Sequence, residues 1–466
     1  MSDGRAYRFH PLERRGLVVG LGAGRIGVLA AGLAAAVGIL GSGLPGGPLV
    51  AMATLTSAVA AVFVPLRGRT ALDWAPVLSS WSLRRRTVLS PPGRALPPRG
   101  VELVAARAVP GEEDLAFVAD RRSGTWAAVL PVEGRSLGLL DPAERDAVLD
   151  GWGAALAATT RPGSPVHRLQ WVARSVPGDG AALRAGAPQG GGVPGASYRE
   201  LVGVPGAAGI QREVLLVVAV DRRGASRQLR AFGRGDVAAA GLLRRELRVL
   251  RGQLQRAEVT AGAALGPQAL ARVVAGRSDG GRPVGGRRGV PDPGPFPGSW
   301  PMGWRDGWAA ARVDGCWAVT FWVAEWPRHD VGPDFLAPML LGRAGTTVSL
   351  TMAPVAASKA AREAESARTA ELADDELRRR AGFVSTARHR RRAQGVSERE
   401  AELADGHGEL RFAGYVTVSA ETPEELETAC STVEAAAQQA GLELRRLYGQ
   451  QVEALTWTLP IGRGLR

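Results

Sequence analysis

The stretch LVVGLGAGRIGVLAAGLAAAVGIL, residues 17–40, consists of apolar or small residues except for Arg25. A second run of the same kind, PLVAMATLTSAVAAVFVPL, occupies residues 48–66, and the turn-forming segment GSGLPGGP separates the two. Each run is close to the ~20 residues that an α-helix needs to cross a ~30 Å hydrocarbon core. The two runs therefore predict a transmembrane helical hairpin within residues 16–66.

The glycines of the first run also match a dinucleotide-binding fingerprint. Gly22, Gly24 and Gly27 fit the pattern G-x-G-x-x-G, which opens a helix against a pyrophosphate. That function needs an acidic residue about 20 positions further on to bind a ribose hydroxyl. No Asp or Glu occurs between Gly16 and Leu72, so we do not expect a nucleotide cofactor. Small residues at four-residue spacing instead favour close packing of membrane helices.

Arginines flank the predicted hairpin on both sides, whereas its turn carries none. The flanking residues are Arg5, Arg8, Arg14 and Arg15 before it, and Arg67, Arg69, Arg84, Arg85 and Arg86 after it. The positive-inside rule then places both ends in the cytoplasm and the turn outside, in an inner (cell) membrane. Two alternatives remain open, a cleaved signal peptide with residues 26–40 as its apolar region and a hairpin buried in a soluble protein.

Three residues near the membrane boundary are further candidate anchors. Arg25 is expected at the cytoplasmic interface, either because its side chain snorkels there or because the span begins after it. ALDWAPVLSSWSLRRR, residues 71–86, places Trp74 and Trp81 beside a basic end, which is typical of a helix on a membrane surface. A core helix with a basic tail is the alternative. SPPGRALPPRG, residues 90–100, follows as a stiff linker.

From Val101 onward, strand and helix signals mix, which predicts an α+β fold. Strands are expected at residues 101–109, 114–120, 124–134, 167–176, 211–221, 316–327 and 346–355. Helices are expected at 141–160 and 236–258, with Asp141 and Asp236 as their N-caps.

The predicted division of the chain has six parts. They are a basic N-terminus (1–15), the hairpin (16–66), the juxtamembrane helix and linker (67–100), a cytoplasmic α+β domain (101–356) with disordered loops near 178–195 and 277–298, a charged helical segment (357–408), and a compact β-α-β unit (409–466). In that last unit, Thr422 and Glu425 form a capping box at the start of the helix.

Motifs for catalysis are missing from the sequence. The only lysine, Lys359, lies in AASKAA, so the chain has no Walker A motif. The five histidines lack metal-ligand spacing, and we expect neither a metal nor a cofactor. Cys316 and Cys430 fall within a predicted strand and a predicted helix, where buried structural thiols are expected. The sequence therefore favours a non-enzymatic protein.

The formal net charge of +13 favours contact with an anionic partner. RRRAGFVSTARHRRR, residues 378–392, is the sharpest charge feature, and nucleic acid or anionic lipid could bind it. Its candidate contacts are Arg378, Arg379, Arg380, Arg390, Arg391 and Arg392. Acidic segments on both sides favour a solvated helix face instead.

Several long phrases resemble a membrane-protein family found beside conjugation genes in actinobacteria. They are YRFHPLERRG, FVPLRGRTALDW, LLDPAERDAVLDGWGAALA, VHRLQWVARSVP, FWVAEWPRHDVGPDFLAPMLL, ADGHGELRFAGYVTVSA and LPIGRGLR. More broadly, the hairpin looks like the small two-helix inner-membrane subunit of type IV secretion systems. The region after it is similar to the membrane-proximal N-terminal domain of the conjugation ATPase, with TWTLPIGRGLR where the motor domain would begin.

The resemblance implies a scaffold that docks a separately encoded conjugation ATPase and other secretion subunits to the membrane, as a possible homo-oligomer. It carries over no catalytic residue, because the motor domain and the Walker lysine are missing. A membrane-tethered DNA-binding protein that guides substrate DNA is the alternative function.

Overall fold

The fold is taken from a computed structural model of the chain. The described residues are 7, 9, 23–43, 45–66, 69–83, 87–89, 96–106, 113–135, 137–177, 200, 209–278, 296, 299–342, 345–380 and 387–465. Most of the two predicted disordered loops, and the arginines at positions 14, 15 and 84–86, lie outside these residues.

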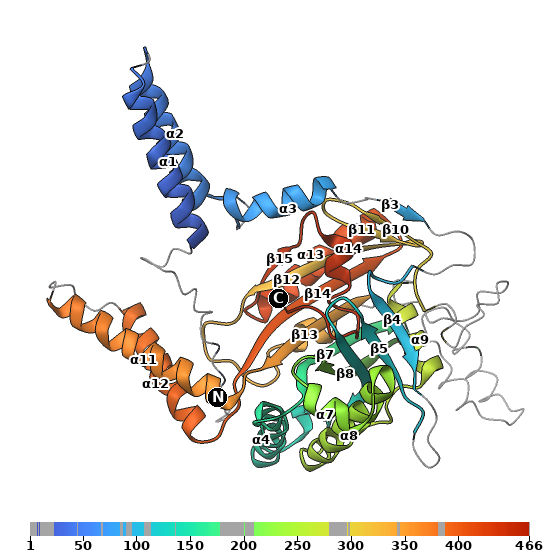
Figure 1. The fold of residues 1–466 in the computed structure, drawn as a ribbon. Helices are drawn as coiled ribbons and strands as arrows, with labels where there is room; N and C mark the ends of the chain where they lie inside the picture. Colours follow the sequence, from blue (N-terminus) through green and yellow to red (C-terminus); the bar gives the residue numbers. More distant parts are fainter. Residues whose placement is uncertain are drawn as a thin grey trace, which may run out of the picture.

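One large antiparallel sheet organises the chain after the first three helices (Figure 1). Its strands lie in the order β3 (Thr87–Leu89), β10 (Gly303–Asp306), β11 (Ala311–Val313), β12 (Cys316–Glu325), β14 (Leu410–Ala420), β13 (Thr346–Pro354), β7 (Val166–Pro177), β8 (Ile210–Asp221), β6 (Thr125–Glu133), β5 (Ala116–Asp120) and β4 (Val101–Ala105). β15 (Glu443–Arg446) also pairs with β12, and β9 (Thr260–Ala261) with β6. β1 (Pro65–Leu66) and β2 (Arg69–Thr70) form a separate two-stranded sheet.

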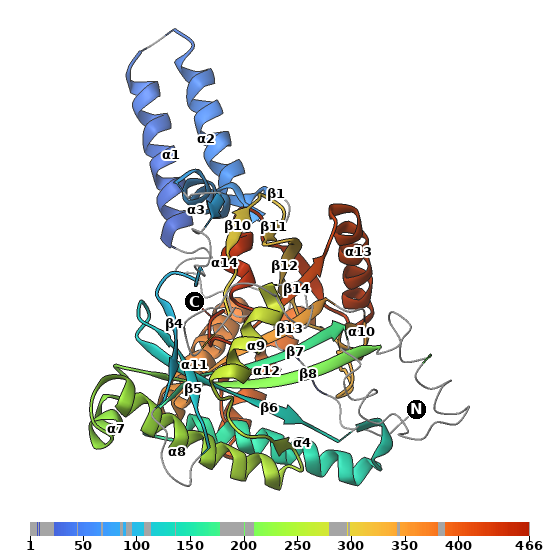
Figure 2. The ribbon, with the colours of Figure 1, turned by 90° about the vertical axis from the view of Figure 1, so that its right-hand side faces the viewer.

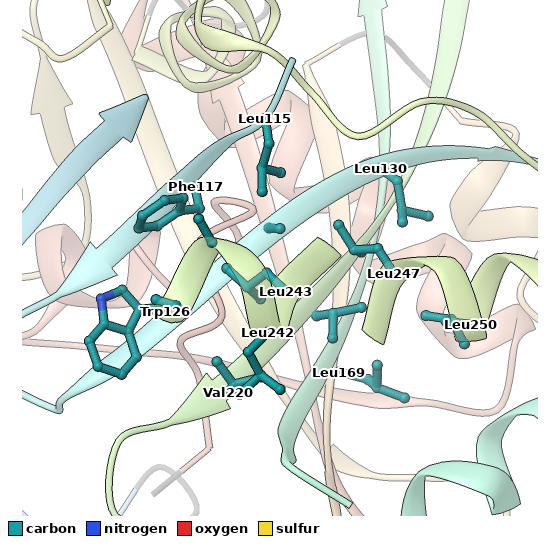
Figure 3. Packing of buried hydrophobic residues seen from close by; sticks show 14 of the residues in the cluster. Leu115, Phe117, Trp126, Leu130, Leu169, Val220, Leu242, Leu243, Leu247 and Leu250 are labelled. Carbon is teal, nitrogen blue, oxygen red and sulfur yellow. The ribbon is translucent and has the colours of Figure 1, made fainter. Parts of the chain in front are cut away.

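Apolar residues on both faces of the central strands explain their burial. Along β8, Leu216, Val218 and Val220 join one core cluster, while Leu215 and Val217 join another on the opposite face. The first cluster is covered by α4 (Pro142–Ala157), α7 (Ser226–Ala231) and α8 (Gly235–Arg256), as Figure 3 shows for α8. The second is covered by α9 (Pro267–Ser278) and by the end of the chain.

The strands on the other side of β13 have their own helical cover. α13 (Pro423–Gln439) and α10 (Ala337–Leu340) pack on Val319 and Phe321 of β12 and on Val416 of β14. α14 (Gln451–Leu455) contacts β12 through Gln451, which accepts a hydrogen bond from the backbone N–H of Thr320.

Two helical pairs extend from the sheet body, α1 with α2 (Figures 1 and 2) and α11 with α12 (Figure 1). α1 (Ala23–Gly41) and α2 (Gly47–Phe63) lie side by side, and α3 (Ala71–Leu83) crosses their base. A Cβ placed on Gly32 would lie 2.5 Å from Cβ of Ala58, so this glycine allows α1 and α2 to approach closely. α11 (Ala357–Arg380) and α12 (Ala387–Ala404) form an arm whose base is joined to β14 by the ion pair between Arg411 and Glu363.

The structure confirms a mixture of helix and antiparallel sheet, with strands and helices close to most predicted ranges. Asp141 and Thr422 are N-caps as predicted, each accepting a hydrogen bond from the N–H three residues later. The prediction for Asp236 is wrong: Arg234 is the N-cap residue, and Asp236 lies in the first turn, where Arg121 holds its carboxylate.

The C-terminal β-α-β order is present, but its two strands are not neighbours. Both β14 and β15 pair with β12, which lies between them. β14 also pairs with β13, so residues 410–420 belong to the same sheet as the strands of residues 101–356. The described residues of the charged segment are helical in α11 and α12, as the sequence predicts for residues 357–408.

Candidate membrane-anchoring site

The apolar surface of α1 and α2 is the first part of the candidate site. Within the described residues, Gly24–Gly41 is the helical stretch long and apolar enough to cross a membrane, and α2 is a shorter apolar helix. Large apolar side chains point outward from both helices: Leu33 is 55% exposed, Leu49 69% and Met52 63%. Exposure of apolar surface to water is unfavourable, and large apolar patches are rare on soluble monomers.

The one charged residue of α1 pairs with the helix that crosses its base. Arg25 Nη2 lies 3.2 Å from Asp73 Oδ2 of α3. The same Asp73 oxygen accepts hydrogen bonds from Oγ1 of Thr70 at 2.8 Å and from its N–H at 3.2 Å. Partial burial raises the pKa of Asp73, but the Thr70 hydrogen bonds and the charge of Arg25 outweigh it, so the pKa lies below its ordinary value. Arg25 is therefore held at the body end of α1.

The two tryptophans of α3 face the sheet body. The Trp74 ring stacks on Trp308 at a centroid distance of 5.8 Å, and the Trp81 ring meets Trp308 edge-on at 5.5 Å. Tyr448 stacks on the same Trp308 ring at 6.2 Å. Both tryptophans therefore dock α3 on the sheet body, because stacked and edge-on aromatic pairs stabilise such a contact. The outward side of α3 instead carries Leu78 and Leu83, and Leu83 is 86% exposed.

A glycine makes this docking possible. Gly449 has φ +72°, and a Cβ there would lie 2.7 Å from Cζ3 of Trp308 and 3.1 Å from Cγ1 of Val77. Its N–H donates to the carbonyl of Trp308 at 2.8 Å. Any side chain at this position would separate Trp308 from α3.

Two residues of the N-terminal region also lie on the sheet body. Tyr7 exchanges backbone hydrogen bonds with Val331, at 2.9 and 3.0 Å. The Phe9 ring stacks on Trp326 at 5.2 Å and contacts Phe335 at 5.4 Å. The chain before α1 and the chain after α2 are therefore both attached to the same body.

The other predicted anion contacts are only partly described. Arg379 and Arg380 are exposed on α11 and both pair with Glu376, at 3.0 and 2.9 Å. The backbones of Arg378, Arg390, Arg391 and Arg392 are helical, but their side chains lie outside the described part of the chain. No contact of these six residues with one another is therefore established.

Residues 457–465, which we call the C-terminal strap, cross the sheet on a row of polar side chains. Gln170 Nε2 donates to the carbonyls of Trp457 (3.0 Å) and Leu459 (2.9 Å), and its Oε1 accepts from the N–H of Gly462 at 2.8 Å. Further clamps come from Arg168 to Leu465, Thr351 to Arg463, and Tyr415 to Gly464. The sequence does not predict that the C-terminal strap binds here. The one signal for it is Gln170, a glutamine at an inward position of a buried strand.

Metal-binding groups and the two cysteines are the remaining candidate features among the described residues. The described residues contain no group of three or more His, Cys, Asp or Glu side chains that could hold a metal ion. Cys430 is buried in α13, and burial raises the pKa of its thiol to about 11 even though nearby Arg446 acts in the opposite direction. The thiol is therefore neutral at physiological pH. Cys316 is half-buried at the start of β12.

No protein-family model matches the sequence, and no curated protein matches it.

Proposed function

We propose that the chain is a non-enzymatic inner-membrane scaffold of a conjugation or type IV secretion-like apparatus, which docks a separate ATPase to the membrane. The anchoring part of this proposal rests on the contacts at the base of α1 and α2. There, the Arg25–Asp73 pair and the stacking of Trp74 and Trp81 on Trp308 join an outward-facing apolar helix pair to the body.

Helix lengths support two membrane spans. At 1.5 Å per residue, the 19 residues of α1 extend about 28 Å and the 17 residues of α2 about 26 Å, close to a ~30 Å hydrocarbon core. Thr54 donates to the carbonyl of Val50 at 2.8 Å, which satisfies its hydroxyl within the helix in apolar surroundings.

The attachment of both flanks supports a topology with both termini in the cytoplasm. Tyr7 and Phe9, which precede α1, contact the same body as α3, which follows α2. Because the body lies on one side of the membrane, the chain between Phe9 and α3 must cross the membrane an even number of times. The 42–46 turn then lies on the opposite side, and the arginines near residues 14–15 and 84–86 face the cytoplasm in accordance with the positive-inside rule.

The docking role rests on the sequence phrases that resemble those of conjugation-associated membrane proteins. A large sheet body held at a membrane without recognisable catalytic chemistry fits a subunit that positions others. Its partners in this proposal are membrane lipid, a conjugation ATPase, other secretion subunits and a second copy of the chain.

The test of the docking role is copurification from membranes. We expect the detergent-solubilised, tagged chain to retain the conjugation ATPase encoded beside it, and we expect a tagged membrane protein of similar size to retain none. Equal recovery of the ATPase with both proteins would refute docking. Complete extraction of the chain by alkaline carbonate would separately refute the membrane anchor.

A second function is favoured by the protruding arm of α11 and α12 (Figure 1). Arginines at its far end would place a basic site away from the body, as in a membrane-tethered DNA-binding protein that guides substrate DNA. The Arg379→Glu/Arg380→Glu variant would then lower DNA affinity and flatten its dependence on salt. Unchanged DNA affinity and salt dependence in that variant would count against this role.

A further inference from the structure

A second basic surface lies on α7 and α8, in a part of the chain outside the proposed anchor. Residues 221–256, which we call the basic face, contain ten arginines and three acidic residues, a net charge of +7. The arginines are Arg222, Arg223, Arg227, Arg230, Arg234, Arg244, Arg245, Arg248, Arg251 and Arg256. All except Arg244, Arg245 and Arg251 are exposed. The surface is therefore much more basic than the chain as a whole.

The acidic residues of the basic face are already engaged within the fold. Asp236 accepts both terminal nitrogens of Arg121 at 2.6 Å, and Glu246 accepts Arg245 at 2.7 Å. Asp221 accepts the N–H of Gly224 at 2.7 Å. The three carboxylates are therefore hydrogen-bonded within the fold. The arginines of α7 remain exposed to solvent.

Part of the basic face is concave. A cavity of about 190 Å³ lies beside α8, and Arg244, Arg248 and Arg251 line it. Their i, i+4, i+7 spacing brings all three onto one side of the helix. Glu113, which is about half exposed, pairs with Arg251 at 3.0 Å and also lines the cavity. Among the described residues that line it, three arginines and one glutamate give a formal charge of +2, and the volume is sufficient for a phosphate group, which guanidinium groups bind through paired hydrogen bonds.

The position of the basic face argues against lipid as its ligand. Figures 1 and 2 both place α7 and α8 at the end of the body opposite α1 and α2. If α1 and α2 are in the membrane, as the proposed function has it, this face points away from the bilayer. Lipid headgroups then cannot reach it, and the ligand must come from the cytoplasm.

The composition of the face distinguishes nucleic acid from an acidic protein. Protein interfaces have apolar and aromatic centres, whereas nucleic-acid interfaces are more polar and strongly basic. The large exposed apolar residues of the basic face are Val237 and Val249, in separate turns of α8. Its only aromatic residue, Phe232, is covered by Gly241 and by the guanidinium of Arg245, so it offers no stacking platform for an unpaired base.

We propose that the basic face, with the Arg244–Arg248–Arg251 cavity, binds the phosphate backbone of duplex nucleic acid without reading its sequence. Two charge-reversal variants test it, Arg227→Glu/Arg230→Glu on α7 and Arg248→Glu/Arg256→Glu on α8. The charge-matched control is Arg305→Glu/Arg328→Glu, at exposed positions outside the basic face. Arg379→Glu/Arg380→Glu tests the arm for comparison.

The assay is fluorescence anisotropy of a labelled random-sequence duplex, titrated with the full-length protein in detergent at several salt concentrations. Each lost phosphate contact lowers the affinity at 0.1 M salt by roughly eightfold and the log–log salt slope by about 0.9. We therefore expect each basic-face variant to bind roughly 60-fold more weakly than wild type, with a slope smaller by about 2. The control variant is expected to bind like wild type.

Three results would overturn the proposal. They are wild-type affinity in both basic-face variants, an equal loss in the control, and loss of binding in the arm variant alone. Tighter binding of polyglutamate than of the duplex would reassign the face to an acidic protein and would also overturn it. Membrane extraction and ATPase copurification do not depend on these arginines, so failure here is distinguishable from failure of the proposed function.

Discussion

Replacement of Trp308 by alanine should release α3 from the sheet body. Trp308 contributes two ring contacts across this junction, with Trp74 at 5.8 Å and with Trp81 at 5.5 Å. Aromatic pairs of this kind contribute about 0.5–1.5 kcal/mol each beyond the apolar area that they bury. The two pairs together contribute about 1–3 kcal/mol and the buried area adds to this, so the Trp308→Ala variant should lose at least about 2–3 kcal/mol of docking free energy.

Hydrogen exchange measured by mass spectrometry on the protein in detergent tests this value. α3 has 13 residues and an internal proline, Pro76, so its helix is marginal without the docking contacts. A loss of 2–3 kcal/mol corresponds to roughly 30- to 150-fold faster exchange of the α3 amides. A Trp308→Phe variant, which keeps one ring at this position, should fall between wild type and Trp308→Ala.

Two controls make the result interpretable. Leu83→Ala alters the exposed end of α3 and should leave its exchange unchanged. Amides in β7 and β8 report on the sheet core and should exchange alike in all variants. If α3 in Trp308→Ala exchanges within threefold of wild type while the core amides are unchanged, the ring contacts do not hold α3 and our interpretation of Trp74 and Trp81 fails.

Three further predictions concern the strap, the anchor base and the cysteines. Gln170→Ala removes three hydrogen bonds that hold the C-terminal strap on the sheet. The strap should lose about 2–4 kcal/mol of docking free energy, so its amides should exchange at least about 30-fold faster. Unchanged exchange of these amides would contradict this prediction. The Arg25–Asp73 pair should stabilise α3 equally at pH 5 and 7, because a lowered pKa keeps Asp73 ionised until the pH falls below 3.8. Asp73→Asn should weaken the exchange protection of α3 at both pH values. Weaker protection of α3 at pH 5 than at pH 7 in the wild type would refute this. A maleimide at pH 7.5 should leave Cys430 unmodified in the folded protein, because its pKa is about 11, whereas half-buried Cys316 should react first; mass spectrometry of the labelled peptides reports either outcome.

The sequence predicted the strands and helices well where local signals were strong. β8 carries the apolar run VLLVVAV, residues 214–220, and α4 follows the capping residue Asp141 and begins with a proline, so their positions follow from nearby residues. β10 and β11, with only four and three residues, were missed because strands this short have no readable periodicity. The insertion of β12 between β14 and β15 depends on contacts distant in sequence, which local patterns do not encode.

The candidate site was predicted in part for similar reasons. The two apolar runs and the isolated Arg25 were visible from composition alone. The partner of Arg25 was not, because Asp73 is 48 residues away. The sequence indicates a membrane-surface position for the tryptophans of α3, because they stand beside arginines. Their stacking partner, Trp308, comes from more than 220 residues further along the chain, and only the folded structure brings the rings together.

The central claim is that α1 and α2 cross a membrane and hold the sheet body on its cytoplasmic side. Labelling of single cysteines in intact cells tests it most directly, in a Cys316→Ser background that leaves only the buried Cys430. Ser42 lies exposed in the turn between α1 and α2, and Ser226 lies exposed on α7 of the body. A membrane-impermeant maleimide should label Ser42→Cys in intact cells and Ser226→Cys only after lysis. Labelling of Ser42→Cys only after lysis would contradict the claim.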